Sequence, residues 1–551
     1  MQQRHRAIVV LALAALGSAF APRAVSAQTL RATIDSLFAP LDRTDGPGCT
    51  VGVDHRTERV TRAYGMANLE HRLALGPESV LETGSVAKQF TAAALVLLEQ
   101  RGKLSLDDDI RKHLPEVPDF GAPITIRHLL THTSGLRDQW GLLVTQGFPP
   151  GREVHTFERI LALIAKQRAL NFPTGAEYLY SNTGYALAAV IVTRVAGVPF
   201  AEFSRTELFE PLGMRRTEWR ADYRKIVPDR ATAYEREGPT WIQDMPFTQV
   251  HGNGGLLTTV GDMLIWNAAL TAGTVPGGAA LVRALETPMR LNDGSEIDYA
   301  LGLSVGRYRG LREVSHGGAT AGYRTYLARW PERDLSVAIF CNDASVNPAE
   351  DAHRLARRVL ELPDEEPSPS APVALAPDQI DRLAGNYRDP AGDQIIRLGK
   401  RDGRLAVLAG PTSLPLEHLG NLEFWSERVG RLRFEPEGDG YRVVRFANAW
   451  RRYRPMPPMP RDSVPLAPYL GRYRSPELDV VLEIGERNGR MVVDHPMMGA
   501  MTVIPLYPDG FGTQGRTFRF RRDRRGRVTG FELFAGRILG VEFERLPAES
   551  R

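Results

Sequence analysis

The chain is poor in cysteine and in lysine. The low cysteine count excludes two classes of protein. Two cysteines in 551 residues, Cys49 and Cys341, are too few for a cysteine-rich metal site or a disulfide-stapled scaffold. Both lie in strand-like segments, so they form one disulfide if those strands are neighbours, and otherwise two buried free thiols. Lysine occurs only six times, so arginine supplies almost all of the 69 basic residues.

A strong excess of one charge is also missing. The net charge of +4 is small for 551 residues, although the isoelectric point is near 9.0. The densest basic run, residues 518–527, is interrupted by Asp-x-x-Gly and favours a solvated hairpin turn over a nucleic-acid patch. No glycine-rich phosphate loop or dinucleotide fingerprint follows a predicted strand. We therefore expect no nucleic-acid partner and no cofactor.

Long apolar runs are absent except near the N-terminus. Two arginines precede an apolar segment, residues 7–16, and Val25-Ser-Ala27 offers a small-residue cleavage site. This pattern predicts a secretory signal peptide over residues 1–27, with Gln28 as the first residue of the mature protein. The apolar segment is too short to span a bilayer, and no later segment is long enough. We expect an exported protein, periplasmic or secreted, without a transmembrane segment.

Composition divides the rest of the chain into three parts. Residues 28–362 have strand-like segments at both ends of a helical middle, which predicts one antiparallel sheet flanked by helices. A Pro/Ser/Ala-rich linker occupies residues 363–377. Short alternating strands with Gly and Asp turns follow in two units, residues 378–457 and 462–548. The expected fold is an α/β (α+β) domain followed by two small all-β, antiparallel, barrel-like domains.

The two β units repeat one another. Gly399-Lys-Arg-Asp-Gly-Arg404 corresponds to Gly485-Glu-Arg-Asn-Gly-Arg490, and Arg433-Phe434 corresponds to Arg519-Phe520, both at an offset of 86 residues. A proline-rich stretch, residues 455–460, separates the copies. Tandem antiparallel barrels or sandwiches suit such a repeat, because closure removes exposed strand edges.

Ser85 and Lys88 are the most informative pair in the sequence. They form a Ser-x-x-Lys at the start of an apolar helical run, residues 91–98, and residues three apart share one face of a helix. A serine hydroxyl is a poor nucleophile until a neighbouring base takes its proton, and a lysine of lowered pKa can be that base. For this motif alone, a helix-capping serine followed by a surface lysine is an equally good interpretation.

Tyr180-Ser-Asn182 is the first segment that can supply a partner for this pair. It stands before an apolar helix that begins near Ala186. A tyrosine can relay a proton if nearby cations lower its pKa, and Lys88 would be such a cation. The amide of Asn182 can hold a substrate carbonyl or fix the lysine. In isolation, the segment is better interpreted as a loop with an aromatic residue packed inward.

His316-Gly-Gly-Ala319 is the second such segment, and it ends a predicted strand. Its glycines, Gly317 and Gly318, let a substrate backbone lie close to the strand. The backbone N–H of Ala319, together with that of Ser85, would form an oxyanion hole for a tetrahedral intermediate. In isolation, a β-turn with an exposed histidine is the better interpretation.

Together these motifs, in this order, resemble the penicillin-recognising serine hydrolases: class C β-lactamases, D-alanyl-D-alanine carboxypeptidases, D-aminopeptidases and related esterases. The resemblance covers about residues 30–362 and includes the segments 64–70, 124–135 and 254–259. It implies a serine β-lactamase/transpeptidase-like catalytic domain. The roles that it implies are Ser85 as the acylated nucleophile, Lys88 as its activating partner, Tyr180 as the general base, Asn182 as a substrate and network ligand, and His316 on the strand that binds the substrate.

His316 departs from one branch of this family. True β-lactamases carry Lys-Thr-Gly here, where a fixed cation helps to hold the antibiotic's carboxylate. A histidine with a pKa of about 6.5 is mostly neutral at pH 7, so efficient β-lactamase activity is not expected. The His-x-Gly variant and the two β units look more like D-aminopeptidases, one of which is similar in having two small barrels and a barrel loop that shapes its active site. Residues 492–501 could form such a loop, although a buried apolar hairpin is the better interpretation.

Two other stretches have features that are found at functional sites. His128 and His132 lie four residues apart, a spacing that can hold zinc on a helix, but the glutamate of a metalloprotease motif is missing. We therefore expect no metal. Residues 139–151 contain Gly and Pro and are expected to form a lid or rim of the substrate cleft.

These observations predict an exported serine hydrolase that acts through an acyl-enzyme on a small peptide, ester or cell-wall-fragment substrate. A peptidase acting on D-amino-acid or cell-wall-type peptides is the first expectation, a broad-specificity esterase the second and a weak β-lactamase the third. Two interpretations from other classes stay open. One is a catalytically silent peptide or cell-wall binding protein, and the other gives the β domains the main role as ligand-binding modules for wall or lipid.

Overall fold

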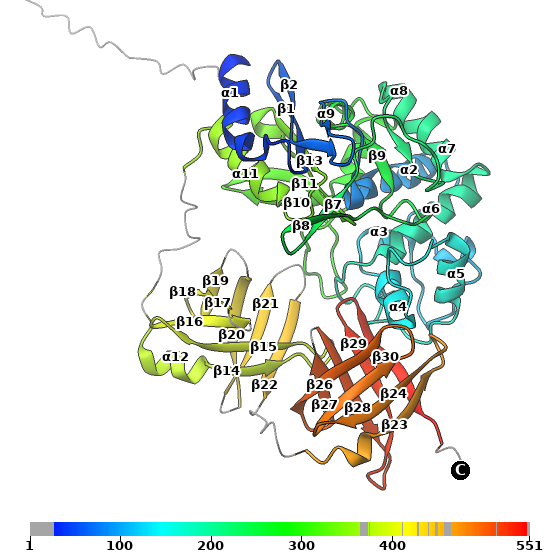
Figure 1. Cartoon of the computed structure of the whole chain (residues 1–551), viewed down its shortest axis with the longest axis vertical. Coiled ribbons are helices and arrows are strands. Elements are labelled where there is room, and N and C mark those ends of the chain that lie inside the picture. Colours follow the sequence, from blue (N-terminus) through cyan, green and yellow to red (C-terminus); the bar gives the residue numbers. More distant parts are fainter. Residues whose placement is uncertain are drawn as a thin grey trace, which may run out of the picture.

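The computed structural model describes residues 27–363, 373, 375–409, 412–426, 429–438, 440–446, 450–456, 464–513 and 515–547. The predicted signal peptide, except Ala27, and most of the predicted linker lie outside the described residues. The chain builds an α+β domain, then a nine-stranded β domain, and then a closed β barrel (Figure 1). We call the last two units the sheet domain and the barrel.

A six-stranded antiparallel sheet forms the centre of the α+β domain. Its strand order is β10-β11-β12-β13-β1-β2, so the first and last strands of the domain meet in the middle, as the sequence predicts. The strands are β1 (Cys49–His55), β2 (Glu58–Tyr64), β10 (Ser304–Tyr308), β11 (Leu311–Thr320), β12 (Tyr323–Trp330) and β13 (Leu335–Cys341). The central strands β1 and β13 are buried on both faces, which explains their nearly continuous apolar sequences.

The two cysteines form a disulfide. Cys49 and Cys341 lie directly opposite each other on β1 and β13, and the bond joins parts of the chain that are 292 residues apart. Of the two alternatives that the sequence leaves open, the structure has the bridge.

Helices cover both faces of the central sheet. On one face, α1 (Ala27–Phe38) and α11 (Pro348–Val359) pack against the strands. On the other face, α9 (Val260–Ala272) leads into a larger core that contains α2 (Lys88–Gln100). Eleven of the 13 residues of α2 are buried, so this helix is the centre of the domain. The remaining helices are α3 (Ile126–Leu130), α4 (Gln139–Gln146), α5 (Phe157–Ala165), α6 (Asn182–Ala196), α7 (Phe200–Ser204), α8 (Glu210–Leu212) and α10 (Gly278–Leu285).

Short strands beside the central sheet complete the α+β domain. They form two hairpins and one three-stranded sheet. They are β3 (Met66–Asn68), β4 (Leu73–Ala74), β5 (Leu81–Glu82), β6 (Glu218–Trp219), β7 (Tyr234–Glu237), β8 (Thr240–Gln243) and β9 (Leu256–Thr258).

The sheet domain and the barrel are both antiparallel, and the barrel closes on itself. The sheet domain begins with α12 (Pro377–Leu383) and contains β14 (Gly385–Arg388), β15 (Ile395–Arg401), β16 (Arg404–Ala409), β17 (Thr412–Pro415), β18 (Glu417–Gly420), β19 (Glu423–Ser426), β20 (Gly430–Glu437), β21 (Gly440–Phe446) and β22 (Trp450–Met456). The barrel consists of β23 (Gly471–Ser475), β24 (Val480–Arg487), β25 (Arg490–His495), β26 (Gly499–Tyr507), β27 (Gly510–Thr513), β28 (Arg516–Arg522), β29 (Val528–Ala535) and β30 (Ile538–Arg545).

The sequence repeat is a repeated hairpin. Strands β15 and β16 turn at Asp402-Gly403, and strands β24 and β25 turn at Asn488-Gly489. Both residues of each turn have positive φ, from +49° to +73°, as a type I′ hairpin turn requires. Asp-Gly and Asn-Gly are the pairs that adopt this geometry most readily, so the turn chemistry fixes the same hairpin in both units.

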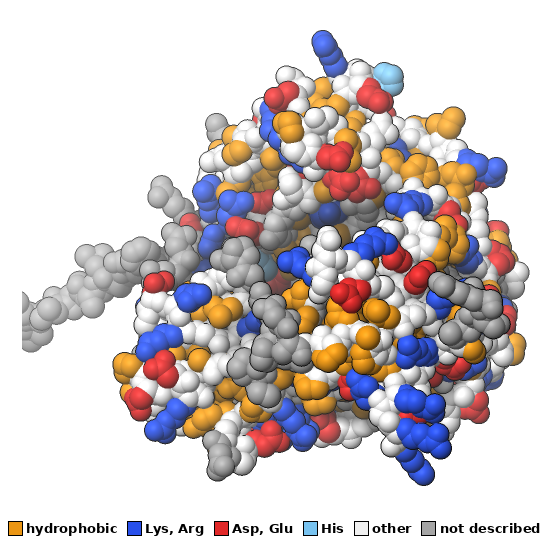
Figure 2. Space-filling view, turned by 60° about the horizontal axis from the view of Figure 1, so that its bottom comes forward, with side chains coloured by type: hydrophobic (Ala, Val, Ile, Leu, Met, Phe, Trp, Pro, Cys, Tyr) orange, Lys and Arg blue, Asp and Glu red, His pale blue; other side chains and the backbone are white. Residues whose placement is uncertain are grey.

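The basic run 518–527 lies in the hairpin of β28 and β29. Asp523 accepts hydrogen bonds from the backbone N–H groups of Arg525 and Arg527, both at 2.9 Å, and closes the turn. The run is therefore the solvated hairpin turn that the sequence predicts. Figure 2 shows blue and red side chains interspersed over the face drawn there, which fits the small net charge. Among the described residues, no single helix is long and apolar enough to cross a membrane, and only α6 taken together with its bent continuation Phe200–Leu212 reaches the required length and composition.

A buried ion pair docks the barrel on the α+β domain. Arg137 Nη1 lies 2.6 Å from Glu477 Oε2, and both side chains are only 1% exposed. The same guanidinium donates to the carbonyls of Leu539 (3.1 Å) and Gly540 (3.0 Å). Burial lowers the pKa of Arg137 and raises that of Glu477, and each partner's charge opposes the shift of the other. The α+β domain thus holds the end of the turn between β29 and β30 in place.

Candidate active site

Ser85 and Lys88 lie side by side where α2 begins. Ser85 belongs to a 3₁₀ turn, η2 (Gly84–Ala87), that runs directly into α2 at Lys88. Lys88 Nζ lies 3.0 Å from Ser85 Oγ. The lysine side chain is fully buried, so the alternative of a surface lysine is wrong.

The surroundings of Lys88 favour its neutral form. Burial lowers the pKa of Lys88 well below its ordinary value, the charge of Arg537 lowers it further, and Asp138 acts in the opposite direction. Lys88 Nζ also donates to Asn182 Oδ1 (3.0 Å) and to the carbonyl of Asn253 (2.5 Å). A neutral amine has two N–H donors, and these two acceptors use both. Its lone pair is then left for the hydroxyl of Ser85, which is the proton acceptor that a serine nucleophile needs.

Tyr180 stands on the other side of the nucleophile. Its hydroxyl is hydrogen-bonded to Ser85, and its ring centre lies 4.9 Å from Lys88 Nζ and 4.6 Å from Arg537 Cζ. Burial raises the pKa of Tyr180, and this outweighs the lowering by the Ser85 hydrogen bond and by Arg537. The sequence-based expectation that Lys88 lowers this pKa is therefore not met. Tyr180 is a neutral phenol at neutral pH, able to pass a proton on, while Lys88 offers the free lone pair.

Asn182 is fixed by Asp138, a residue that the sequence pattern does not single out. The backbone N–H and the side-chain amide of Asn182 both donate to Asp138 Oδ2, at 2.7 and 3.0 Å. This turns the amide oxygen toward Lys88. Asp138 is also the N-cap of α4 and accepts the N–H of Trp140 at 3.0 Å. An Asp before an apolar helix indicates only a cap, so no sequence signal gave its second role.

Strand β11 approaches the nucleophile turn closely. A Cβ on Gly318 would stand 2.0 Å from the Thr83 carbonyl oxygen, and one on Gly84 would stand 2.7 Å from Ala319 N. Glycine is therefore required at both positions, and the φ of Gly84 is +51°. The backbone N–H groups of Ser85 and Ala319 lie on facing segments, as an oxyanion hole requires.

His316 is hydrogen-bonded through both ring nitrogens. Nδ1 lies 2.6 Å from the Gly317 carbonyl oxygen, and Nε2 lies 2.8 Å from the hydroxyl of Tyr299. A neutral ring protonated on Nδ1 donates to the carbonyl and accepts from the hydroxyl. Burial, followed by the charge of Lys88, lowers the pKa of His316 to about 4. The histidine therefore carries no charge at neutral pH.

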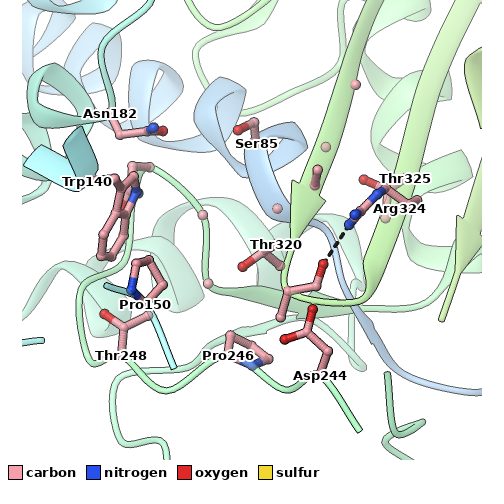
Figure 3. A pocket seen from close by; sticks show the side chains of 18 of the residues that line it. Ser85, Trp140, Pro150, Asn182, Asp244, Pro246, Thr248, Thr320, Arg324 and Thr325 are labelled. Atoms are coloured by element: carbon pink, nitrogen blue, oxygen red, sulfur yellow. Dashed lines mark hydrogen bonds between the residues drawn. The ribbon is translucent and has the colours of Figure 1, made fainter. Parts of the chain in front are cut away.

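Ser85, Tyr180, Asn182 and His316 line an open cavity of about 690 Å³. In Figure 3, Ser85 lies at one end of the cavity and Asp244 at the other. Trp140 and Pro150 form a side wall. The stretch 139–151 therefore borders the cleft, as the sequence predicts, and it does so partly as helix α4.

A turn of the barrel completes the cavity wall. Arg537, between β29 and β30, is one of the lining residues, and its carbonyl accepts the N–H of Asp138 at 3.3 Å. The segment 492–501, considered for this role from the sequence, forms the β25–β26 hairpin and packs on α4 instead. There, His495 Nε2 lies 2.9 Å from the Thr145 carbonyl oxygen. The barrel contributes to the site through a different turn from the one that the sequence suggested.

His128 and His132 have structural partners. His128 lies in α3 and closes a capping box with Thr125, whose N–H it accepts on Nδ1 at 3.1 Å. His132 lies beyond the end of α3 and accepts the N–H of Ser181 on Nδ1 at 3.1 Å. Its ring centre is 4.1 Å from that of Tyr180. His132 thus supports the floor of the site.

Known proteins are similar to this chain in sequence and in fold. A D-aminopeptidase from Brucella melitensis biotype 2 is 27% identical, over 91% of this chain and 96% of its own length. Penicillin-binding protein 4* from Bacillus subtilis (strain 168) is 29% identical, over 59% of this chain and 75% of its own length. The structure of an octameric penicillin-binding protein homologue from Pyrococcus abyssi is similar in fold, with a TM-score of 0.53 and 22% identity, over 86% of this chain and 99% of that one.

The family match fits the site geometry. The sequence model of the Beta-lactamase family matches residues 34–361, which is more than half of the chain. The matched region contains Ser85, Lys88, Tyr180 and His316, the residues that the structure brings together. The protein therefore belongs to the β-lactamase family and is a serine hydrolase.

Proposed function

We propose that the protein is an exported peptidase that acts through an acyl-enzyme on D-amino-acid or cell-wall-type peptides. The observation that carries the proposal is the buried amine of Lys88, 3.0 Å from Ser85 Oγ and with its pKa lowered. Burying a lysine without an anionic partner costs free energy. A silent binding protein has no use for this arrangement, whereas a serine nucleophile depends on it.

Acylation begins when Ser85 Oγ attacks the carbonyl carbon of the substrate. The Oγ–C bond forms, and the hydroxyl proton passes to Lys88 Nζ. The N–H groups of Ser85 and Ala319 stabilise the negative charge on the carbonyl oxygen. The C–N bond then breaks, and the leaving nitrogen receives the proton back through Lys88 and Tyr180. Water next attacks the ester carbon, gives its proton to the same network, and releases Ser85.

The choice of substrate class rests on the relatives and on His316. D-aminopeptidases match this chain over most of its length, which favours D-amino-acid peptides. Esters undergo the same acyl transfer, so an esterase is the second candidate. The neutral His316 offers no fixed cation where a β-lactamase has a lysine, so β-lactam hydrolysis ranks third.

The nucleophile is tested with a fluorophosphonate probe that labels active serines. We expect wild type and the control Ser105→Ala to be labelled, and Ser85→Ala to be neither labelled nor active. Labelling that persists in Ser85→Ala would exclude Ser85 as the nucleophile. Wild type that traps neither the probe nor any reactive ester would favour the binding protein.

The substrate class is tested by comparing kcat/KM for D- and L-alanine anilides, a D-alanyl-D-alanine peptide, short esters and a chromogenic cephalosporin. The proposal expects D-configured amides to be cleaved in preference to L-configured ones. Equal rates on both enantiomers, with much faster ester cleavage, would make the protein an esterase.

Export is proposed from residues 1–27 alone. The mature protein should begin at Gln28 in N-terminal sequencing and should be recovered outside the cytoplasm. A variant lacking residues 2–27 should stay in the cytoplasm. Recovery of the full chain from the cytoplasm, with its first residues intact, would contradict export.

A further inference from the structure

The catalytic cavity receives a positive charge from the barrel. Arg537 lies in the turn between β29 and β30, about 450 residues along the chain from the nucleophile, and it lines the cavity that contains Ser85. Its guanidinium carbon is 4.6 Å from the ring centre of Tyr180, which is hydrogen-bonded to Ser85. Its side chain is 47% exposed, so the guanidinium is open to the cavity.

The hydrogen-bond donors of this guanidinium are uncommitted. The nearest carboxylate, that of Asp138, lies 3.8 Å from Arg537 Nη1, beyond hydrogen-bond distance. Its Oδ2 atom already accepts two N–H groups of Asn182. Within the described part of the chain, the Arg537 guanidinium donates no hydrogen bond, whereas its backbone carbonyl is held by Asp138 and Asn171. The turn is thus fixed by its backbone, and its guanidinium keeps its hydrogen-bond donors beside the carboxylate of Asp138.

Other charged groups of the cavity do not take this role. Arg220 is bound by Glu82 at 2.8 Å, and both side chains are buried. Arg324 donates to two backbone carbonyls, and its charge acts on the carboxyl group of Asp244. His316 is neutral. Arg537 is therefore the cation in this cavity, among the described residues, whose guanidinium donates no hydrogen bond to a carboxylate or a carbonyl; its ion pair with Asp138 is a long one, at 3.8 Å.

The sign of the charge reverses on the other side of Tyr180. A second cavity, of about 590 Å³, meets the first along Tyr180 and His316. Its charged lining residues are Glu296, Asp298, Arg307 and Glu313, so acids outnumber bases there. A substrate lying across Ser85 meets a positive group on the Arg537 side and a lining with more acids than bases on the other, where Glu296 is paired with Arg290 at 2.8 Å. This polarity favours one orientation of a charged substrate.

We propose that Arg537 selects substrates that carry a carboxylate next to the scissile bond. The planar guanidinium offers donors in the geometry that binds a carboxylate through both oxygens. A free ammonium at the same place is repelled, so the chain prefers peptides that present a carboxylate there over peptides that present a free amine. The inference rests on the proposed acyl-enzyme hydrolase and specifies its substrates.

Activated esters test this preference because they differ only in charge. On the acyl side, p-nitrophenyl hemisuccinate is compared with p-nitrophenyl butyrate (neutral) and p-nitrophenyl γ-aminobutyrate (cationic). On the leaving-group side, meta-carboxyphenyl acetate is compared with phenyl acetate. Each kcat/KM is divided by the rate of spontaneous hydrolysis. We expect wild type to prefer the carboxylate on one of the two sides by roughly 10- to 100-fold, the effect of one charge-assisted hydrogen-bond pair.

Variants separate charge recognition from a structural role. Arg537→Gln should abolish the preference, Arg537→Lys should keep part of it, and the control Arg525→Gln, in the exposed β28–β29 turn, should keep all of it. A merely structural role would lower the rates for charged and neutral esters equally. The wild-type preference should also shrink as salt is raised.

Two failures can be told apart. If wild type hydrolyses the neutral esters but shows no preference for a carboxylate on either side, or if Arg537→Gln keeps the preference, the role of Arg537 is wrong and the hydrolase stands. If no ester is hydrolysed and Ser85 is not labelled, the proposed function is wrong and the role of Arg537 falls with it.

Discussion

At the scale of single residues, the main property of the site is that three of its ionisable side chains are held in their neutral forms. Burial favours the neutral forms of Lys88, His316 and Tyr180. Asp138 and Arg537 are the charged groups that act on the pKa of Lys88, in opposite directions. A neutral lysine is a stronger base toward Ser85 than a neutral histidine whose ring nitrogens are both occupied. The chemistry therefore depends on the protonation state of one amine.

The pH dependence of kcat/KM should follow Lys88. Only the deprotonated amine accepts the proton of Ser85, so activity rises with pH through the lowered pKa of Lys88. Replacing Arg537 with Gln removes a cation that holds this pKa down, so the rising limb should move to higher pH. Arg537→Lys keeps the charge and should leave the limb in place. The measurement uses a neutral ester, and a limb that moves to lower pH in Arg537→Gln would contradict the role of Lys88.

Lys88 and Tyr180 should behave as one unit. Lys88→Ala and Tyr180→Phe each remove a proton-transfer partner of Ser85, and each should lower kcat/KM by roughly 10²- to 10⁴-fold. The kcat/KM of the double variant should be little lower than that of the less active single variant, because either loss breaks the same relay. If the two factors multiply in the double variant, the residues act independently and the shared relay is wrong.

Sequence patterns predicted the residues that carry recognisable motifs. Ser85, Lys88 and Tyr180 could be picked out because each belongs to a short motif at the start of a helix, and the fold brings the three together. Asp138 and Arg537 were missed for a physical reason. Each is an ordinary cap or turn residue in its own segment and gains its role only from a segment far away in the chain.

At the scale of elements, the site depends on how closely strand β11 approaches the turn η2. The two backbones touch at Gly84 and Gly318, where no Cβ fits. The hairpin turns of the β units could be read from Asp402-Gly403 and Asn488-Gly489, because the φ values needed there are a local property. No comparable local pattern predicts that the turn at Arg537 reaches the active site, because its position depends on how the barrel docks on the α+β domain.

Gly318→Ala should damage catalysis more than stability. Its Cβ would meet the Thr83 carbonyl at 2.0 Å, and β11 would have to move away from η2. Displacing the N–H of Ala319 from the oxyanion position should lower kcat by roughly 10²- to 10³-fold. Gly306→Ala in β10, where a Cβ meets nothing within 4 Å, is the matched control. The melting temperature is measured alongside. If Gly318→Ala keeps the wild-type kcat, β11 does not contribute to the oxyanion hole.

At the scale of the whole molecule, two long-range connections hold distant parts of the chain. The disulfide Cys49–Cys341 ties the first strand of the central sheet to its last, and the pair Arg137–Glu477 ties the barrel to the α+β domain. The first follows from strand neighbours that the sequence could anticipate. The second joins two domains, and no local sequence pattern predicts how these domains pack.

The disulfide should stabilise the α+β domain without affecting chemistry. It closes a loop of 292 residues, and its loss should lower the free energy of unfolding by roughly 2–5 kcal/mol. The double variant Cys49→Ala/Cys341→Ala should unfold at lower denaturant but keep kcat, because both cysteines belong to a hydrophobic cluster separate from the one that contains Val86 and Ala87, next to Ser85. Two free thiols in denatured, unreduced wild type would show that the bridge is absent in solution.

The barrel should prove necessary for substrate selection through the ion pair that docks it. Glu477→Gln leaves the Arg137 guanidinium buried without its counter-charge, which costs roughly 3–5 kcal/mol. Arg137 also holds the carbonyls of Leu539 and Gly540, so the turn that presents Arg537 should loosen. Because Lys88 and Ser85 lie within the α+β domain, hydrolysis of neutral esters should fall less than the preference for carboxylate esters. The exposed Glu486→Gln is the control. If Glu477→Gln unfolds like wild type and keeps the full carboxylate preference, the ion pair does not position the turn, and the barrel reaches the site by other contacts.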